Sequence, residues 1–204
     1  MRGWMRSNDH LVGDIGRRIS SSTLRRGTRV TAIETDLRSY VRDVPDFPTP
    51  GIDFKDVTPL LADAQAFRRA TEAMAAPFVD DRVTHVVSIE ARGFIFGAPV
   101  AQSLGAGFIP VRKKGKLPSA TERIEYALEY GSGILEIHRD AYEPPARVLV
   151  VDDVLATGGT ASATAQLIER LGGEVVGLSF LIALSFLNGR QALGSHKTSA
   201  LITY

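Results

Sequence analysis

The sequence predicts an α/β fold with a twisted, mostly parallel central sheet flanked by helices. Two kinds of segment alternate along the chain: short β-branched apolar runs, and longer runs with apolar residues at helical spacing. The expected strands are 84–89, 107–111, 147–151 and 175–182, and the expected helices are 64–78, 93–104 and 160–171. Strands that alternate with helices form a parallel sheet covered on both faces. Segments near 32–60 and 185–204 are expected to form a small hood beside this sheet.

The first 31 residues differ from the rest. They contain seven Arg and two Asp, a net charge of +5, and no sustained apolar period. We expect a disordered or dispensable extension, with an organellar transit peptide or a start codon assigned too far upstream as alternatives. Residues 32–204 then form a single domain.

Composition narrows the possible functions. The net charge of +1 favours neither nucleic acid nor a membrane as partner. The chain has no Cys, which excludes disulfides and thiolate chemistry and fits a reducing compartment, so we expect a cytoplasmic protein. The four His show no ligand spacing, and we expect no metal site built by the protein alone.

The N-terminal part of the domain begins with a short expected helix, 35–42. Residues 44–51 follow, with prolines at three of eight positions. Proline removes a backbone donor and restricts the residue before it, so this segment should be an extended, pinned loop rather than a helix.

The middle of the chain combines a basic stretch with a hairpin. Residues 112–123 are rich in Lys, Arg and Gly. Residues 124–129 and 133–137 are then expected to pair as a β-hairpin, with 130–132 at its turn. After the helix 160–171, Gly172 and Gly173 are expected to end it as a C-cap.

The most informative segment is 148–160, Val-Leu-Val-Val-Asp-Asp-Val-Leu-Ala-Thr-Gly-Gly-Thr. An apolar strand ends in Asp152 and Asp153, and a loop of small residues then opens a helix. Ligands of open α/β sheets bind beyond the carboxyl ends of strands, and the start of a helix offers unpaired N–H groups to a phosphate. The candidate phosphate-binding residues are Ala156, Thr157, Gly158, Gly159 and Thr160.

The two acids need a different partner, because carboxylates repel phosphate. They can accept hydrogen bonds from sugar hydroxyls a few ångströms away. A phosphate at one end of a ligand and a vicinal diol nearby describe ribose 5-phosphate.

This segment resembles the signature for phosphoribosyl diphosphate (PRPP) of the type I phosphoribosyltransferases. Other segments resemble the adenine-specific branch, in the same order, from about residue 34 to about 194. They are 45–51 and 54–59 in its hood, 90–97 in its pyrophosphate loop, and 111–118 and 128–131 in its mobile loop and hairpin.

The resemblance implies purine salvage: adenine and PRPP give AMP and pyrophosphate through an oxocarbenium-like transition state. Arg92 would bind pyrophosphate, following an expected cis peptide between Glu90 and Ala91. Glu129 would face the purine and exchange or share a proton with it. Asp152 and Asp153 complete the implied catalytic set.

The remaining roles also rest on the resemblance. Arg112, Lys113, Lys114 and Lys116 would form a cationic lid over the diphosphate. Phe54 and Leu184 would sandwich adenine, with backbone amides near Asp53 recognising it.

Lys55 would join the pyrophosphate contacts. Relatives often carry Arg there, so bidentate geometry is lost, and Asp53 is a second departure from the family's pattern.

The resemblance further implies Mg²⁺ bound with PRPP and a homodimer. Mg²⁺ relies largely on substrate oxygens and water, so no protein cage is expected. Two alternatives remain open at this point: a phosphoribosyltransferase for another base such as xanthine or hypoxanthine, and a PRPP- or purine-sensing module without turnover.

Overall fold

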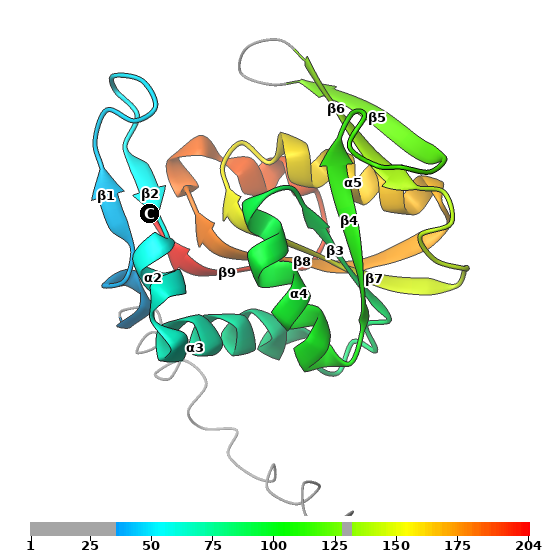
Figure 1. Ribbon diagram of the computed structural model, residues 1–204, viewed down its shortest axis with the longest axis horizontal. Helices are drawn as coiled ribbons and strands as arrows, with labels where there is room; N and C mark the ends of the chain where they lie inside the picture. The colour runs from blue at the N-terminus through cyan, green and yellow to red at the C-terminus, as the bar shows by residue number, and fades with distance from the viewer. Residues whose placement is uncertain (1–35, 128–131) are drawn as a thin grey trace, which may run out of the picture.

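The computed structural model describes residues 36–127 and 132–204, and its centre is a seven-stranded sheet with the order β5-β6-β4-β3-β7-β8-β9 (Figure 1). The strands are β3 (His85–Ile89), β4 (Gly107–Lys113), β5 (Thr121–Ala127), β6 (Ser132–His138), β7 (Ala146–Leu155), β8 (Gly173–Ala183) and β9 (Thr198–Thr203). Neighbours among β4, β3, β7, β8 and β9 pair in parallel, while β5 and β6 form an antiparallel hairpin beside β4. The predicted mostly parallel sheet is confirmed.

Helices cover both faces of the sheet (Figure 1). They are α2 (Thr58–Ala62), α3 (Ala64–Ala75), α4 (Arg92–Leu104), α5 (Gly159–Arg170) and the 3₁₀ helices η1 (Ala76–Phe78), η2 (Ser185–Leu187) and η3 (Gly189–Leu193). Alternate residues of β7 enter two separate cores. Val148 and Val150 pack on the α5 side, and Leu149 and Val151 on the side of α3 and α4. Burial on both faces explains the uninterrupted apolar run.

Helix α4 lies unusually close to the sheet. A Cβ on Gly97 would lie 2.5 Å from Ser88 Cβ, and a Cβ on Gly93 would lie 2.5 Å from Asp152 Oδ1. The Ser88 hydroxyl donates a 2.6 Å hydrogen bond to the Val151 carbonyl, so β3 and β7 are tied together beneath the helix. The two glycines therefore bring the start of α4 directly onto the carboxyl ends of these strands.

The hood is a separate two-stranded antiparallel sheet, β1 (Arg42–Val44) and β2 (Phe54–Asp56). Two expectations are corrected here. Of the helix expected over 35–42, only 36–38 is helical among the described residues, because Arg42 already pairs with Asp56 in the hood sheet. The segment 185–204 does not belong wholly to the hood, because its last part is β9, a parallel edge strand that pairs with β8.

Candidate functional site

Strand β7 carries the two acids into the sheet edge. It runs to Leu155, so Asp152 and Asp153 lie within the strand and not after its end, which corrects the shorter strand expected from the sequence. The strand extends because β8 pairs alongside it as far as Leu155 and Ala183. Ala156 to Gly158 follow as a bend, and α5 begins at Gly159.

The loop between β7 and α5 is fixed by close packing against η3. Gly158 has a φ of +83°, and a Cβ there would lie 2.3 Å from the Gly189 carbonyl oxygen. A Cβ on Gly189 would lie 2.0 Å from the Ala156 carbonyl oxygen. Gly158 is therefore required both for its conformation and for space, and Gly189 is required for space. The sequence reading missed Gly189, because a glycine after Asn188 signals only a turn.

The start of α5 is suited to an anion. Gly158 is the N-cap and no side chain of the described residues caps the helix, so its first N–H groups lack a side-chain acceptor. Thr157 is exposed and Thr160 is half-buried beside them. The predicted group from Ala156 to Thr160 is thus the bend and the first two residues of α5, with amides and hydroxyls that can bind a phosphate.

Asp153 and Arg92 meet at the sheet edge. Asp153 is 5% exposed, and its Oδ2 lies 2.6 Å from Arg92 Nε. The contact is an ion pair without hydrogen-bond alignment, and Oδ2 accepts no hydrogen bond from the described residues. Burial raises the pKa of Asp153, and the Arg92 charge works against that rise. This carboxylate oxygen is therefore buried, in contact with Arg92, and without a hydrogen bond from the described residues.

Asp152 lies beside it, under the start of α4. Its Oδ1 accepts a 2.9 Å hydrogen bond from the Asp153 backbone N–H. Burial raises the pKa of Asp152 well above its ordinary value, and the neighbouring Asp153 charge raises it further. A pair of like charges is costly in this position, and groups with perturbed pKa values concentrate at functional sites.

Arg92 also connects this edge to the hood. Its guanidinium lies 5.0 Å from the centre of the Phe54 ring, which in turn makes an edge contact with Phe47 at 5.2 Å. The peptide between Glu90 and Ala91, just before α4, is cis, as expected. The structure therefore brings together three predicted residues that lie far apart in the chain: Phe54, Arg92 and Asp153.

The basic stretch is divided between a strand and a loop. Arg112 and Lys113 belong to β4 and not to the expected lid, because they pair with Glu136 and Leu135 of β6. Arg112 Nε donates to Glu90 Oε2 at 2.6 Å, and its Nη1 donates to the Lys116 carbonyl at 3.0 Å.

The loop itself starts at Lys114. The Gly115 N–H donates to the buried carboxylate of Glu136 at 2.9 Å, which anchors the base of the loop. The side chains of Lys113, Lys114 and Lys116 are exposed. None forms an ion pair within the described part of the chain, so their charges are available to a ligand.

Lys55 lies in a different environment from the one expected. Its ammonium group is 2.7 Å from both Asp43 and Asp53, and its side chain is 10% exposed. Burial works against the charge, but the two carboxylates outweigh it and raise the pKa of Lys55. Neighbouring strand residues point to opposite faces, so Phe54 meets Arg92 while Lys55 turns to the acids. In the ligand-free chain Lys55 therefore belongs to an ion cluster with Asp43 and Asp53, and its pyrophosphate contact stays a prediction.

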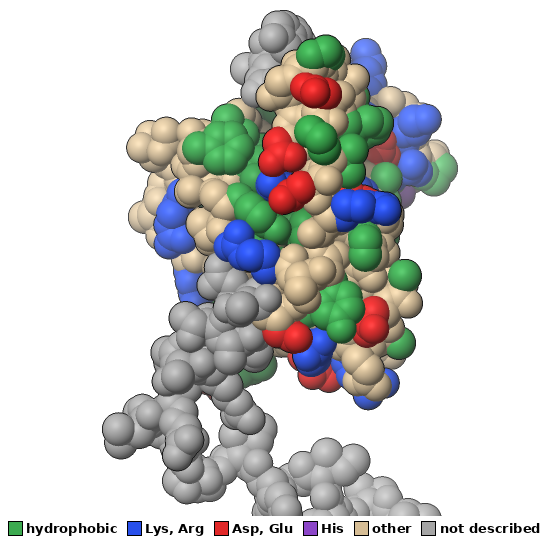
Figure 2. Space-filling model, turned by 90° about the vertical axis from the view of Figure 1, so that its left-hand side faces the viewer, with side chains coloured by type: hydrophobic (Ala, Val, Ile, Leu, Met, Phe, Trp, Pro, Cys, Tyr) green, Lys and Arg blue, Asp and Glu red, His purple; other side chains and the backbone are tan. Residues whose placement is uncertain are grey.

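Figure 2 views the side of the molecule that carries the hood, where acidic and basic side chains lie next to one another. This agrees with the ion pairs of the hood, which also include Arg42 with Asp56.

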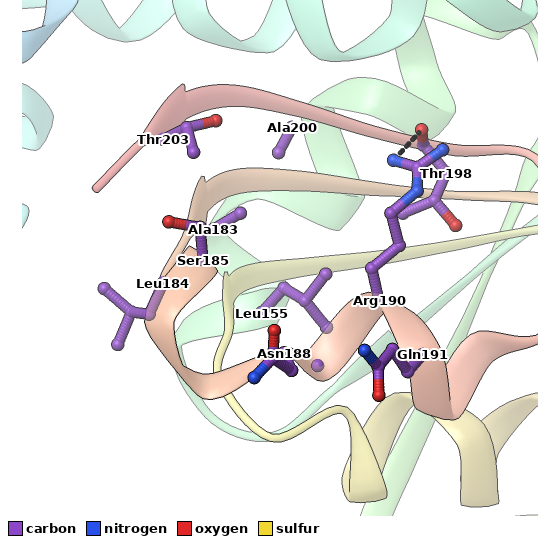
Figure 3. Close-up of a pocket in the computed structure, with 11 residues that line it drawn as sticks. Leu155, Ala183, Leu184, Ser185, Asn188, Arg190, Gln191, Thr198, Ala200 and Thr203 are labelled. Atoms are coloured by element: carbon purple, nitrogen blue, oxygen red, sulfur yellow. Dashed lines mark hydrogen bonds between the residues drawn. The ribbon is translucent and has the colours of Figure 1, made fainter.

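Leu184 lines a pocket of about 410 Å³ between η3 and the carboxyl ends of β8 and β9 (Figure 3). Its lining residues are Leu155, Ala183, Leu184, Ser185, Asn188, Gly189, Arg190, Gln191, Thr198, Ala200 and Thr203. Neither Phe54 nor the acid pair is among them, so this pocket is not the expected adenine sandwich. Glu129 lies outside the described residues, as does the extension 1–31.

Two further features concern metals and membranes. Within residues 36–127 and 132–204, no three His, Asp or Glu side chains gather closely enough to hold a metal ion. Over the same ranges, no helix has the length and apolar character needed to cross a bilayer.

Comparison with known proteins gives a consistent result. The family model "Phosphoribosyl transferase domain" matches residues 60–194. The chain is 56% identical to an adenine phosphoribosyltransferase of Myxococcus xanthus over 174 residues, covering 85% of this chain and 95% of that protein. It is also 56% identical to one of Carboxydothermus hydrogenoformans, covering 83% of this chain and 99% of that protein.

Solved structures agree with these sequence matches. The adenine phosphoribosyltransferase of Rhodothermus marinus superimposes with a TM-score of 0.82 at 51% identity, over 85% of this chain and 99% of that one. The Saccharomyces cerevisiae enzyme, bound to adenine and an imino-altritol bisphosphate, gives 0.79 at 35% identity, over 84% and 99% of the two chains.

Proposed function

The chain belongs to the adenine phosphoribosyltransferases, and from this we propose a role in the reaction for each residue of its site. We also propose that the protein acts in the cytoplasm. The reaction is purine salvage: the 5-phosphoribosyl group passes from PRPP to adenine, giving AMP and pyrophosphate. The observation that carries the site assignment is the 2.6 Å contact between Arg92 and Asp153, next to the uncapped start of α5.

The phosphoribosyl half of the substrate would bind along β7 and α5. The turn from Ala156 to Thr160 holds the 5-phosphate through backbone N–H groups and hydroxyls. Asp153 and Asp152 accept hydrogen bonds from the ribose hydroxyls. As the bond at ribose C1 stretches, the sugar gains oxocarbenium-like positive charge, which the two carboxylates stabilise.

The leaving group and the base would occupy the other side of C1. Arg92 binds the pyrophosphate through bidentate hydrogen bonds, and Lys113, Lys114 and Lys116 supply further positive charge as the pyrophosphate leaves. Adenine lies between Phe54 and Leu184. Glu129 shares a proton with the purine as the new N-glycosidic bond forms. When pyrophosphate binds Arg92, the ion pair between Arg92 and Asp153 breaks. The Asp153 carboxylate can then accept hydrogen bonds from the ribose hydroxyls.

We assign Mg²⁺ to the substrate rather than to a protein cage. Within residues 36–127 and 132–204, no three His, Asp or Glu side chains lie close enough together to hold a metal ion. This arrangement fits an ion carried mainly by diphosphate oxygens and water. When bound, Mg²⁺ would neutralise part of the charge on the leaving group.

We also propose a homodimer through the outer face of α4 and β4. Ile95 is 40% exposed and Phe108 is 37% exposed, and the Phe108 ring packs edge-on against Phe94 at 5.7 Å. Large apolar side chains clustered on a surface commonly mark an interface. Light scattering after gel filtration should give twice the chain mass, and Ile95→Glu should shift the protein to monomer. A monomeric parent protein would contradict the proposal.

The function is tested by measuring AMP formation from adenine and PRPP, with xanthine and hypoxanthine as competing bases. We expect adenine to be strongly preferred. Asp153→Ala and Glu129→Ala should each lower kcat/KM by about 100-fold or more, because Asp153 stabilises the charge on the ribose and Glu129 shares a proton with the purine. Activity at the parent level in both variants would overturn the role assignments. Binding of PRPP without AMP formation would favour a sensor instead.

A further inference from the structure

Tyr204 is held to the end of β8 by its backbone. Its N–H donates to the Ala183 carbonyl at 2.9 Å, and its carbonyl accepts hydrogen bonds from the N–H of Ser185 at 2.8 Å and from the Ser185 hydroxyl at 2.6 Å. These bonds bracket Leu184, the residue between the two partners. The Tyr204 backbone therefore holds the residues on both sides of Leu184, whose own N–H donates to the Leu155 carbonyl at 2.9 Å.

The Tyr204 side chain contacts the hood instead. The Arg38 guanidinium lies over its ring at 4.3 Å from the centre, and the Lys55 ammonium group lies over it at 4.4 Å. Lys55 is the neighbour of Phe54 on β2 and is itself fixed by Asp43 and Asp53. Figure 1 shows the end of the chain beside β2.

The contact depends on the electrons of the ring. Burial raises the pKa of the Tyr204 phenol, so the ring is neutral at physiological pH and attracts both cations through its face. An aliphatic side chain of similar size would fill the space without this attraction. Phenylalanine would keep it.

We propose that Tyr204 is a positioning residue for the purine base: its backbone fixes Leu184, its ring holds Lys55, and it thereby sets the separation between Leu184 and Phe54. The inference rests on the proposed function, in which these two side chains form the walls of the base site. It adds a specific role for a residue that the proposed function places in neither substrate site. Its effect should fall on adenine and spare PRPP, whose site lies on β7, α4 and α5.

Steady-state kinetics on Tyr204→Leu and Tyr204→Phe test this, with adenine varied at saturating PRPP and PRPP varied at saturating adenine. We expect Tyr204→Leu to raise KM for adenine about tenfold and to change KM for PRPP less than about twofold, a size in line with the loss of two cation–π contacts. Tyr204→Phe should stay within about twofold for both substrates. Thermal unfolding of each variant, measured in parallel, reports any general loss of structure.

Lys55→Met provides a second test that leaves Tyr204 in place. It removes one of the two cations, so KM for adenine should rise about threefold with little change for PRPP. An adenine KM equal to that of the parent enzyme in both Tyr204→Leu and Lys55→Met would overturn the proposal. So would a rise in KM for PRPP as large as that for adenine. A parent enzyme that forms no AMP would instead overturn the proposed function itself.

Discussion

The edge of β7 and the hood hold their residues in place by different means. At the β7 edge, close packing around glycines fixes the structure: Gly158 and Gly189 approach each other through backbone atoms across the loop, and Gly93 lies against the Asp152 side chain. In the hood, charged side chains on separate segments fix the structure, as in the cluster of Lys55 with Asp43 and Asp53. The β7 edge cannot accept larger side chains without moving its backbone, while the ion pairs of the hood can rearrange with a small loss of free energy. The phosphoribosyl site should therefore be rigid, and the base site adjustable.

Gly158→Ala should break the rigid region and produce the largest effect. The added Cβ would lie 2.3 Å from the Gly189 carbonyl oxygen at a φ of +83°. To relieve this steric clash, η3 or the loop must move, and the loop amides would then no longer be placed to bind the phosphate. We expect kcat/KM to fall by about 100- to 1000-fold and the free energy of unfolding to fall by about 2 kcal/mol. Kinetics and denaturant unfolding measure the two effects.

Gly105→Ala is the matched control. Gly105 also has a positive φ, +64°, but a Cβ there would meet nothing within 4 Å. Only the conformational cost remains, about 1 kcal/mol, and activity should be close to that of the parent enzyme. Equal losses of activity in the two variants would show that close packing of the loop is not what matters.

The same difference explains what could be predicted from the sequence. The turn from Ala156 to Thr160 and the two acids form one local motif, so their placement follows from strand and helix signals alone. The partnership of Lys55 with Asp43 and the stacking of Arg92 on Phe54 join residues that only the fold brings together. No local pattern reports such pairs. Gly189 was missed for the same reason, since its contact with Ala156 crosses the chain.

The errors at element ends have a similar origin. Strand β7 continues past the acids because β8 pairs beside it, and Arg112 and Lys113 join β4 because β6 pairs with them. Strand β9 adds to the sheet through β8 rather than through any strong pattern of its own. Local preference located the centres of these elements, and pairing with neighbours decided their ends.

Arg92→Ala should sharpen the comparison, because Arg92 touches both regions. The variant loses the contact with Asp153 and the contact with Phe54. We expect kcat/KM to fall by about 10- to 100-fold, because the leaving pyrophosphate loses a bidentate cation. Arg92→Lys should recover only part of this, since Lys keeps the charge but not the fork. Full recovery by Lys would show that charge alone is needed.

Asp152→Asn should separate stability from activity. Burial, and then the Asp153 charge, raise the pKa of Asp152 above its ordinary 3.8, so the charged form of Asp152 is less favourable in the folded protein than in the unfolded chain. The resulting destabilisation is absent below about pH 4 and grows as pH rises toward the raised pKa. Each unit of that rise corresponds to about 1.4 kcal/mol. Asn should therefore make the ligand-free protein more stable at pH 7 than the parent, with no gain at pH 3.5, while activity falls.

Unfolding curves in denaturant at the two pH values measure this difference. Asn keeps an oxygen that can accept from the Asp153 N–H, so the backbone contact at 2.9 Å is preserved. A stability gain of equal size at both pH values would point to packing rather than to the charge of Asp152.

Lys116→Ala should give the smallest effect, because the Lys116 side chain forms no ion pair within the described part of the chain. Its side chain is exposed, while its carbonyl accepts from Arg112 and is unaffected by the substitution. Removing one of several loop cations should raise KM for PRPP about threefold and leave KM for adenine unchanged. The effect should shrink as salt is added, since screening weakens exposed charges first. A rise that persists at 0.5 M salt would instead indicate a direct, closed contact, and the loop would then belong with the rigid region.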